Sequence, residues 1–238
     1  RTRAGLDEGG WRAQMALPIW LSTISHRRDD EVVHHELAAL PQPLRSPEAL
    51  SVLARLSFQR GETATARRVW QEALAKNWSA FDDAFIKALP SLDLDDESLR
   101  TILDFGEDDR RGVIVAIARL PGLSHDICQR LSRATNSSVR VALAENPDTP
   151  SDILSVLATG DVYEAMAVAA HPATPSAVFE QLSKRPEMSV RRAVAASPRC
   201  PVAVFESLAQ DAEIPVLEAV RGNPAAPEAL RVQVALML

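Results

Sequence analysis

The sequence VRVALAENPDTP occupies residues 139–150, and a close variant of it, VRRAVAASPRCP, occupies residues 190–201. The proline at the ninth position of each copy recurs every 25 or 26 residues in the second half of the chain, at Pro121, Pro147, Pro172, Pro198 and Pro224. A fixed period of about 20–50 residues indicates a stacked repeat protein. Such arrays bury a continuous core between neighbours and usually present an extended surface, so they rarely enclose a reaction chamber.

The residues before each repeat proline predict a short helix. Alanine stands five positions before the proline in every unit, at Ala116, Ala142, Ala167, Ala193 and Ala219. Positions four and eight before the proline hold mostly Val, Leu or Ile, and these offsets fall on one face of an α-helix. The proline ends the helix because it disfavours helical geometry in the residue before it. We expect the alanine column to lie between layers, where its small side chain allows close approach.

A second proline follows three residues after the first in four of the five units. Thr149-Pro150 predicts an N-cap followed by proline at the first helical position, and Thr149 with Asp152 approximates a capping box. The same Thr-Pro pair recurs at residues 174–175. Apolar residues six and ten positions after the first proline predict a second helix. Each unit is then a pair of short helices that must stack on its neighbours to bury its apolar face.

On these residues, the segment 112–235 resembles the variant leucine-rich repeat (LRV) family in five units. The resemblance implies a right-handed superhelix of alternating α- and 3₁₀-helices. A member of that family carries an iron–sulfur cluster on a cysteine-rich N-terminal segment. This chain has no cysteine before Cys128, so we expect no cofactor. Glu164 in the Val column and Arg221 in an Ala column depart from the pattern, and they predict local loosening at Glu164 and a solvent-facing last unit.

The first half of the chain predicts further helices. Residues 47–80 are similar to a single tetratricopeptide (TPR) hairpin, with Ser46-Pro47 as its cap and with the family's spacing at Leu53, Ala54, Gly61, Ala66, Trp70, Ala73 and Leu74. Residues 29–37 predict another helix. Residues 82–103 predict a degenerate repeat with Pro90 in its turn and with Leu99 and Ile102 as buried anchors.

The predicted fold class is therefore all-α, a right-handed α-solenoid of two-helix repeats with an N-terminal helical cap. The cap spans residues 1–111 and the five LRV-like repeats span residues 112–238. The chain begins at Arg1 without a methionine, and we interpret it as an internal fragment or a piece of a longer protein.

Composition excludes several classes of protein. Hydrophobic residues make up 46% of the chain and charged residues 24%, which is ordinary for a folded soluble domain. The net charge is −6 with no basic excess in either half, which argues against a nucleic-acid partner. No run of about 18 apolar residues occurs, so we expect no membrane span. Two cysteines without a CxxC pattern exclude a disulfide framework. Because free cysteines suit a reducing compartment, we expect a cytoplasmic protein.

Two clusters suggest chemistry, and in both the plainer interpretation is favoured. His26, His34 and His35, with acidic residues nearby, contain the elements of a metal site, but adjacent histidines on a helix point about 100° apart and make a poor chelate. Residues 93–97 and 107–109 are acidic but lack the glycine and closing glutamate of a calcium loop. We interpret the histidines as ordinary surface residues and the acidic residues as a solvated edge of the protein. The alternative is that the acidic edge binds a basic partner.

The best candidate contact surface is a column of arginines. Arg140 and Arg191 share one repeat position, and Arg192 adjoins it. Equivalent positions line up along a superhelix, so these side chains are able to form a ladder for an acidic peptide or for phosphates. Solvated arginines on a helix face are the plainer interpretation.

The sequence therefore predicts a non-enzymatic protein–protein interaction scaffold whose partner is another protein or an acidic peptide. Two alternatives stay open: a nucleic-acid-associated helical repeat protein, and a regulatory or sensor portion of a larger protein.

Overall fold

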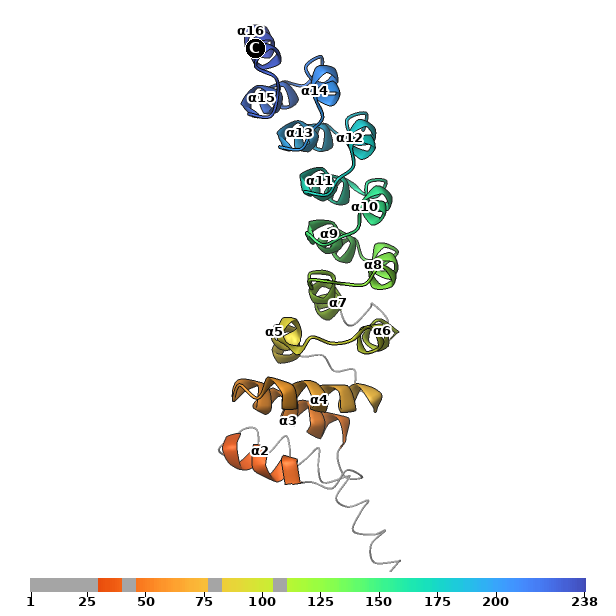
Figure 1. The fold of residues 1–238 in the computed structure, drawn as a ribbon, viewed down its shortest axis with the longest axis vertical. Helices are drawn as coiled ribbons and strands as arrows, with labels where there is room; N and C mark the ends of the chain where they lie inside the picture. Colours follow the sequence, from red (N-terminus) through yellow and green to blue (C-terminus); the bar gives the residue numbers. More distant parts are fainter. Residues whose placement is uncertain (1–29, 40–45, 77–82, 105–110) are drawn as a thin grey trace, which may run out of the picture. The chain divides into compact units, whose positions relative to one another are not determined.

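The computed structural model describes residues 30–39, 46–76, 83–104 and 111–238. Within these ranges it contains fifteen helices and no strands, which confirms the all-α prediction (Figure 1). The chain divides into two compact units, residues 1–106 and residues 107–238. The predicted boundary lay five residues further on, after residue 111. The two units are described separately below.

The first unit is built around a helical hairpin. Helix α2 (Asp30–Ala39) packs on α3 (Pro47–Gln59), and α3 packs along α4 (Thr63–Ala75). Ser46 caps α3 by accepting a hydrogen bond from the Ala49 N–H at 3.2 Å, and the connecting turn uses Gly61 at φ +80°. The side chains predicted to fill the hairpin are buried: Leu53, Ala54, Ala66, Trp70, Ala73 and Leu74. The predicted pair of packed helices is confirmed within residues 46–76, and its assignment to the TPR family stays a prediction.

Two shorter helices complete the first unit, α5 (Asp83–Leu92) and α6 (Asp96–Asp104). The prediction that Pro90 lies in the turn is wrong, because Pro90 lies inside the last turn of α5. A proline so close to a helix end removes a single backbone hydrogen bond, which the helix tolerates. The chain turns instead at Asp93, which has φ +46°. Leu99 and Ile102 are buried, as predicted.

The second unit consists of five helix pairs, which we number 1 to 5 along the chain. Their bounds are α7 (Arg111–Ala118) with α8 (His125–Ser132), α9 (Ser137–Glu145) with α10 (Ser151–Leu157), α11 (Val162–Ala170) with α12 (Ser176–Leu182), α13 (Met188–Ala196) with α14 (Val202–Leu208), and α15 (Ile214–Gly222) with α16 (Glu228–Met237). Each first helix packs on the first helix of the next pair, and each second helix packs on the first helix that follows it (Figure 1).

The core of the second unit differs in one column from the prediction. The alanines five positions before the repeat proline are partly exposed in four of the five pairs, and only Ala142 is fully buried. The fully buried columns are the apolar residues four positions before the proline and the alanines three positions before it, Ala118, Ala144, Ala169 and Ala195. Close contact between first helices therefore uses the later alanine column. In pair 5 that position holds Arg221, which is exposed as predicted.

The turn inside each pair also differs from the prediction. Pro150 is itself the N-cap residue of α10, with φ −61° and ψ 146°, and it makes no side-chain cap. The Thr149 hydroxyl does not cap α10 but donates to the Leu143 carbonyl at 2.5 Å, back across the turn. Pro175 and Thr174 repeat this arrangement. The second helices are α-helical, whereas the LRV resemblance implied 3₁₀-helices.

Candidate interaction surface

The guanidinium of Arg140 donates hydrogen bonds to two different segments of the chain. Its Nε and Nη2 donate to Glu164 Oε1 at 3.0 Å and 2.7 Å, and its Nη1 donates to the carbonyls of Ala134 and Thr135. Glu164 lies on α11 with only 1% of its side chain exposed, so the pair joins pair 2 to pair 3. The prediction of local loosening at Glu164 is wrong, because two charge-assisted hydrogen bonds from Arg140 to Oε1 hold the buried carboxylate in place.

Arg191 repeats this arrangement two repeat units later. Its Nε and Nη2 donate to Asp211 at 2.7 Å and 3.2 Å, and its Nη1 donates to the Arg185 and Pro186 carbonyls. The hydrogen bond to Asp211 raises the pKa of Arg191 above its ordinary value. Burial raises the pKa of Asp211, but the hydrogen bonds from Arg191 and from the Glu213 N–H outweigh it, and the net pKa is lowered.

The three residues predicted as a contact surface therefore separate. Arg140 connects pairs 2 and 3, Arg191 connects α13 to the loops before and after pair 4, and most of their donors already have partners within the chain. Arg192 is exposed on α13, and no hydrogen bond or ion pair of its guanidinium is found in the part of the chain that the structure describes. Of these three arginines, Arg192 is the one that an external acidic group is able to reach directly.

Arg192 shares its repeat position with Val141 on α9 and Met166 on α11, six residues before the proline. Both apolar side chains are partly exposed. Tyr163, three residues before Met166 on the same face of α11, is 71% exposed. We call these four residues, Val141, Tyr163, Met166 and Arg192, the open face. Because α9, α11 and α13 pack in succession, the open face continues across three helices.

Tyr163 was not singled out by the sequence analysis, although a signal was present. It is the chain's one tyrosine, and it stands nine positions before the repeat proline, where the other units have Gly112, Ser138, Ser189 and Pro215. A large aromatic in a column of small residues marks a position where the side chain projects beyond its neighbours.

The row of second helices carries more charge than the open face. His125 and Asp126 on α8, Asp152 on α10, and Glu180 and Lys184 at α12 are exposed. His125 Nε2 lies 2.7 Å from Asp152 Oδ2, and this hydrogen bond lowers the pKa of Asp152. Because both side chains are more than half exposed, the pair contributes little to stability.

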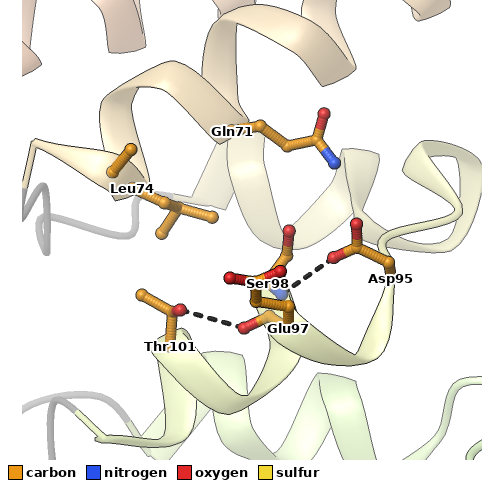
Figure 2. Close-up of a pocket in the computed structure, with 7 residues that line it drawn as sticks. Gln71, Leu74, Asp95, Glu97, Ser98 and Thr101 are labelled. Atoms are coloured by element: carbon orange, nitrogen blue, oxygen red, sulfur yellow. Dashed lines mark hydrogen bonds between the residues drawn. The ribbon is translucent and has the colours of Figure 1, made fainter.

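Residues of α4, of α6 and of the turn before α6 line a shallow pocket of about 300 Å³ in the first unit (Figure 2). Its polar groups are already used locally. Asp95 accepts a hydrogen bond from the Ser98 N–H at 2.8 Å, and bonding from Ser98 lowers the pKa of Asp95. Thr101 donates to the Glu97 carbonyl at 2.9 Å. Asp95 is thus a helix cap, and the pocket is too open and polar to resemble a ligand site.

The other predicted clusters do not come together as sites. His34 Nε2 lies 3.0 Å from the Ser57 hydroxyl and 3.8 Å from Glu62, which packs α2 against the hairpin. Among the described residues no group of three metal-ligating side chains is found. His26 and residues 107–109 lie outside the described residues. Burial raises the pKa of the Cys128 thiol to about 11 and that of Cys200 to about 12, so neither is an activated nucleophile.

Comparison with known proteins found no matching family model, no matching curated protein and no matching solved structure. The resemblances to LRV and TPR repeats therefore rest on the residues alone. Across the described helices, none combines the length and the apolar character that crossing a lipid bilayer requires.

Proposed function

We propose that this protein is a non-enzymatic scaffold that binds another protein through the open face. In this proposal the five helix pairs form a right-handed α-solenoid of LRV type, and the partner lies across the first helices α9, α11 and α13. A solenoid of this kind presents a long, continuous surface without needing an enclosed site.

The observation that carries the proposal is the composition of the open face. Tyr163 is 71% exposed and stands beside the partly exposed Met166. Tyrosine, methionine and arginine are enriched at the centres of protein interfaces, and tyrosine contributes a large contact area at a low cost in conformational entropy. A lone exposed apolar residue is ordinary on a protein surface, but here an aromatic, two apolar side chains and an exposed arginine occupy adjoining positions.

The charges favour a protein partner with acidic groups over a nucleic acid. The open face carries a single arginine, whereas proteins that bind phosphate backbones use several cations. The chain as a whole has a net charge of −6. Arg192 is placed to pair with one carboxylate at the edge of an otherwise apolar contact.

The test compares two matched double variants. Tyr163→Ala with Arg192→Glu removes the anchor and reverses the charge of the open face. Val156→Ala with Lys184→Glu makes similar changes on the row of second helices, where Val156 is 53% exposed and Lys184 is exposed. All four side chains are on the surface, so we expect both variants to unfold within a few degrees of the wild type, as circular dichroism will check.

Quantitative capture of partners from the source proteome is then compared for the three proteins. We expect proteins that bind the wild type to be retained by the control variant and to be reduced at least tenfold with the open-face variant. Equal recovery by both variants would contradict the proposal. Direct titration with duplex DNA at low salt is a second check, because tight and salt-sensitive binding would favour the nucleic-acid alternative.

A further inference from the structure

At two of the four junctions between helix pairs, the residue directly before the repeat proline is an asparagine that forms a buried link to the preceding pair. Asn146 is 4% exposed, and its Nδ2 donates to the carbonyls of Ala118 at 2.9 Å and Leu120 at 2.7 Å. Its Oδ1 accepts from the Asp148 N–H at 3.1 Å. Asn223 does the same between pairs 4 and 5, since its Nδ2 donates to the Ala195 and Ser197 carbonyls, both at 2.8 Å.

His171 makes a weaker version of this link between pairs 2 and 3. Its Nδ1 accepts from the Ala173 N–H at 3.0 Å, so the ring proton is on Nε2, which donates to the Asn146 carbonyl at 2.8 Å. His171 therefore supplies one hydrogen bond to the preceding pair where each asparagine supplies two.

Ser197 occupies the same position between pairs 3 and 4 and supplies none. It is 3% exposed, and its Oγ has no hydrogen-bond partner among the described residues. Its backbone, at φ −68° and ψ 129°, matches that of Asn146, at φ −73° and ψ 117°. The position thus has the geometry of the asparagine link, but its side chain is too short to reach the preceding pair.

The polar links on the surface also differ between junctions. Ion pairs between helices of neighbouring pairs are found at two junctions, Arg119–Glu145 and His125–Asp152 for pairs 1 and 2, and Arg140–Glu164 for pairs 2 and 3. Between pairs 3 and 4, in the part of the chain that the structure describes, the side-chain links found go through loops: Arg185 donates to the Gly160 carbonyl at 3.2 Å, and Arg191 on α13 donates to the Arg185 and Pro186 carbonyls.

We propose that the junction between pairs 3 and 4 is a built-in weak joint, at which pairs 4 and 5 open together as one block. The stability of a repeat array is approximately the sum of the stabilities of its units and of its junctions, so partial opening occurs where a junction is weakest. Pairs 4 and 5 stay together because Asn223 donates two buried hydrogen bonds to pair 4, and Arg191 on α13 binds Asp211 in the loop that leads to α15.

The joint has a consequence for the open face, which rests on the function proposed above. Tyr163 and Met166 lie on α11 before the joint, and Arg192 lies on α13 after it. Opening separates the two parts of the open face, and a partner that contacts both parts holds the joint closed. The proposal for the free chain does not depend on this consequence.

Hydrogen exchange measured by mass spectrometry on the whole chain, at urea concentrations below the unfolding transition, tests the joint. We expect the amides of α13, α14, α15 and α16 to exchange together and at least tenfold faster than those of α9 and α11. Ser197→Asn restores two buried hydrogen bonds, and we expect it to slow exchange of this block about tenfold, because each bond contributes about 0.5–1.5 kcal/mol and 1.4 kcal/mol is a factor of ten.

Asn223→Ser is the reciprocal variant, because it removes the two buried asparagine hydrogen bonds from the junction between pairs 4 and 5. We expect α15 and α16 then to open by themselves, ahead of α13 and α14. The proposal is overturned if α13 and α14 of the wild type exchange as slowly as α11, or if a folded Ser197→Asn protein exchanges like the wild type. Should Ser197→Asn fail to fold, the response to Asn223→Ser decides the question.

Discussion

The two units of this chain bury their apolar side chains in different ways. In the first unit Trp70 is fully buried between Phe58 and Phe85, with ring centroids 6.2 Å and 5.3 Å away. Its hairpin helices are 13 residues long. In the second unit the helices have 7 to 10 residues, and all four tryptophans of the chain lie outside it. A long hairpin with a large aromatic encloses its own core, whereas short pairs rich in alanine and valine must share one.

The second unit also uses polar contacts to hold neighbouring helix pairs together. The second unit has buried hydrogen bonds and ion pairs between consecutive pairs, at Asn146, Arg140, Arg191 and Asn223. These links fix the spacing of neighbours whose small side chains do not interlock strongly. A single substitution in the first unit is therefore expected to change the stability of one shared core, whereas one in the second unit changes the stability of a junction between two helix pairs.

Removing Trp70 is expected to have the largest effect. Trp70→Ala leaves a large cavity in the hairpin and should destabilise the first unit by about 3–5 kcal/mol. Urea denaturation followed by segment-resolved hydrogen exchange will show whether the loss is confined to residues 46–104. Trp70→Phe keeps an aromatic ring in the core, and we expect it to recover more than half of the loss. An equal loss of protection throughout residues 111–238 would show that the two cores are not separate.

Breaking the Arg140–Glu164 ion pair is expected to have the next largest effect. Arg140→Ala leaves the carboxylate of Glu164, which is 1% exposed, without its partner, and this should cost about 3 kcal/mol of stability. Thermal and urea unfolding measure the change.

The matched control is the double variant Arg140→Leu with Glu164→Val. Valine stands at the position of Glu164 in the other four pairs, so we expect the double variant to unfold within about 1 kcal/mol of the wild type. If the double variant is as unstable as Arg140→Ala, the carboxylate is not the source of the loss.

The smallest of these effects depends on pH. The pKa of Asp211 is lowered in the folded protein, so its contribution is fully present above the ordinary aspartate pKa of about 3.9. It is lost as the pH falls from there through the lowered pKa. We expect Asp211→Asn to be less stable than the wild type by about 1 kcal/mol at neutral pH, with the difference shrinking below about pH 4. A difference independent of pH, in urea unfolding at several pH values, would contradict this assignment.

The sequence predicted the helices of both units well, for local physical reasons. The period of the repeat proline, the apolar column four residues before it and the cap at Ser46 all act within one or two helical turns. The buried side chains of the TPR-like hairpin, including Ala54, Ala66 and Trp70, followed from the same short-range pattern.

The errors arose where one local partner competed with another. Thr149 has the residue type and position of a helix cap, but its hydroxyl donates to the Leu143 carbonyl instead, because Pro150 already provides the extended backbone of the N-cap position. Five residues before the proline, alanine is constant in the sequence, yet the column that packs most closely lies two residues later. Both columns are rich in alanine, so composition alone did not separate them.

Local sequence is sufficient to predict that this chain forms helices, where each helix pair ends and which apolar columns are available for a core, because these properties depend on neighbours along the chain. Which arginines of the predicted ladder are exposed follows from the packing of distant segments. Arg140 and Arg191 share a column, yet their acidic partners lie 24 and 20 residues further on, one on a helix and one in a loop. Such pairing depends on how successive helix pairs are stacked, and no fixed spacing in the sequence encodes it.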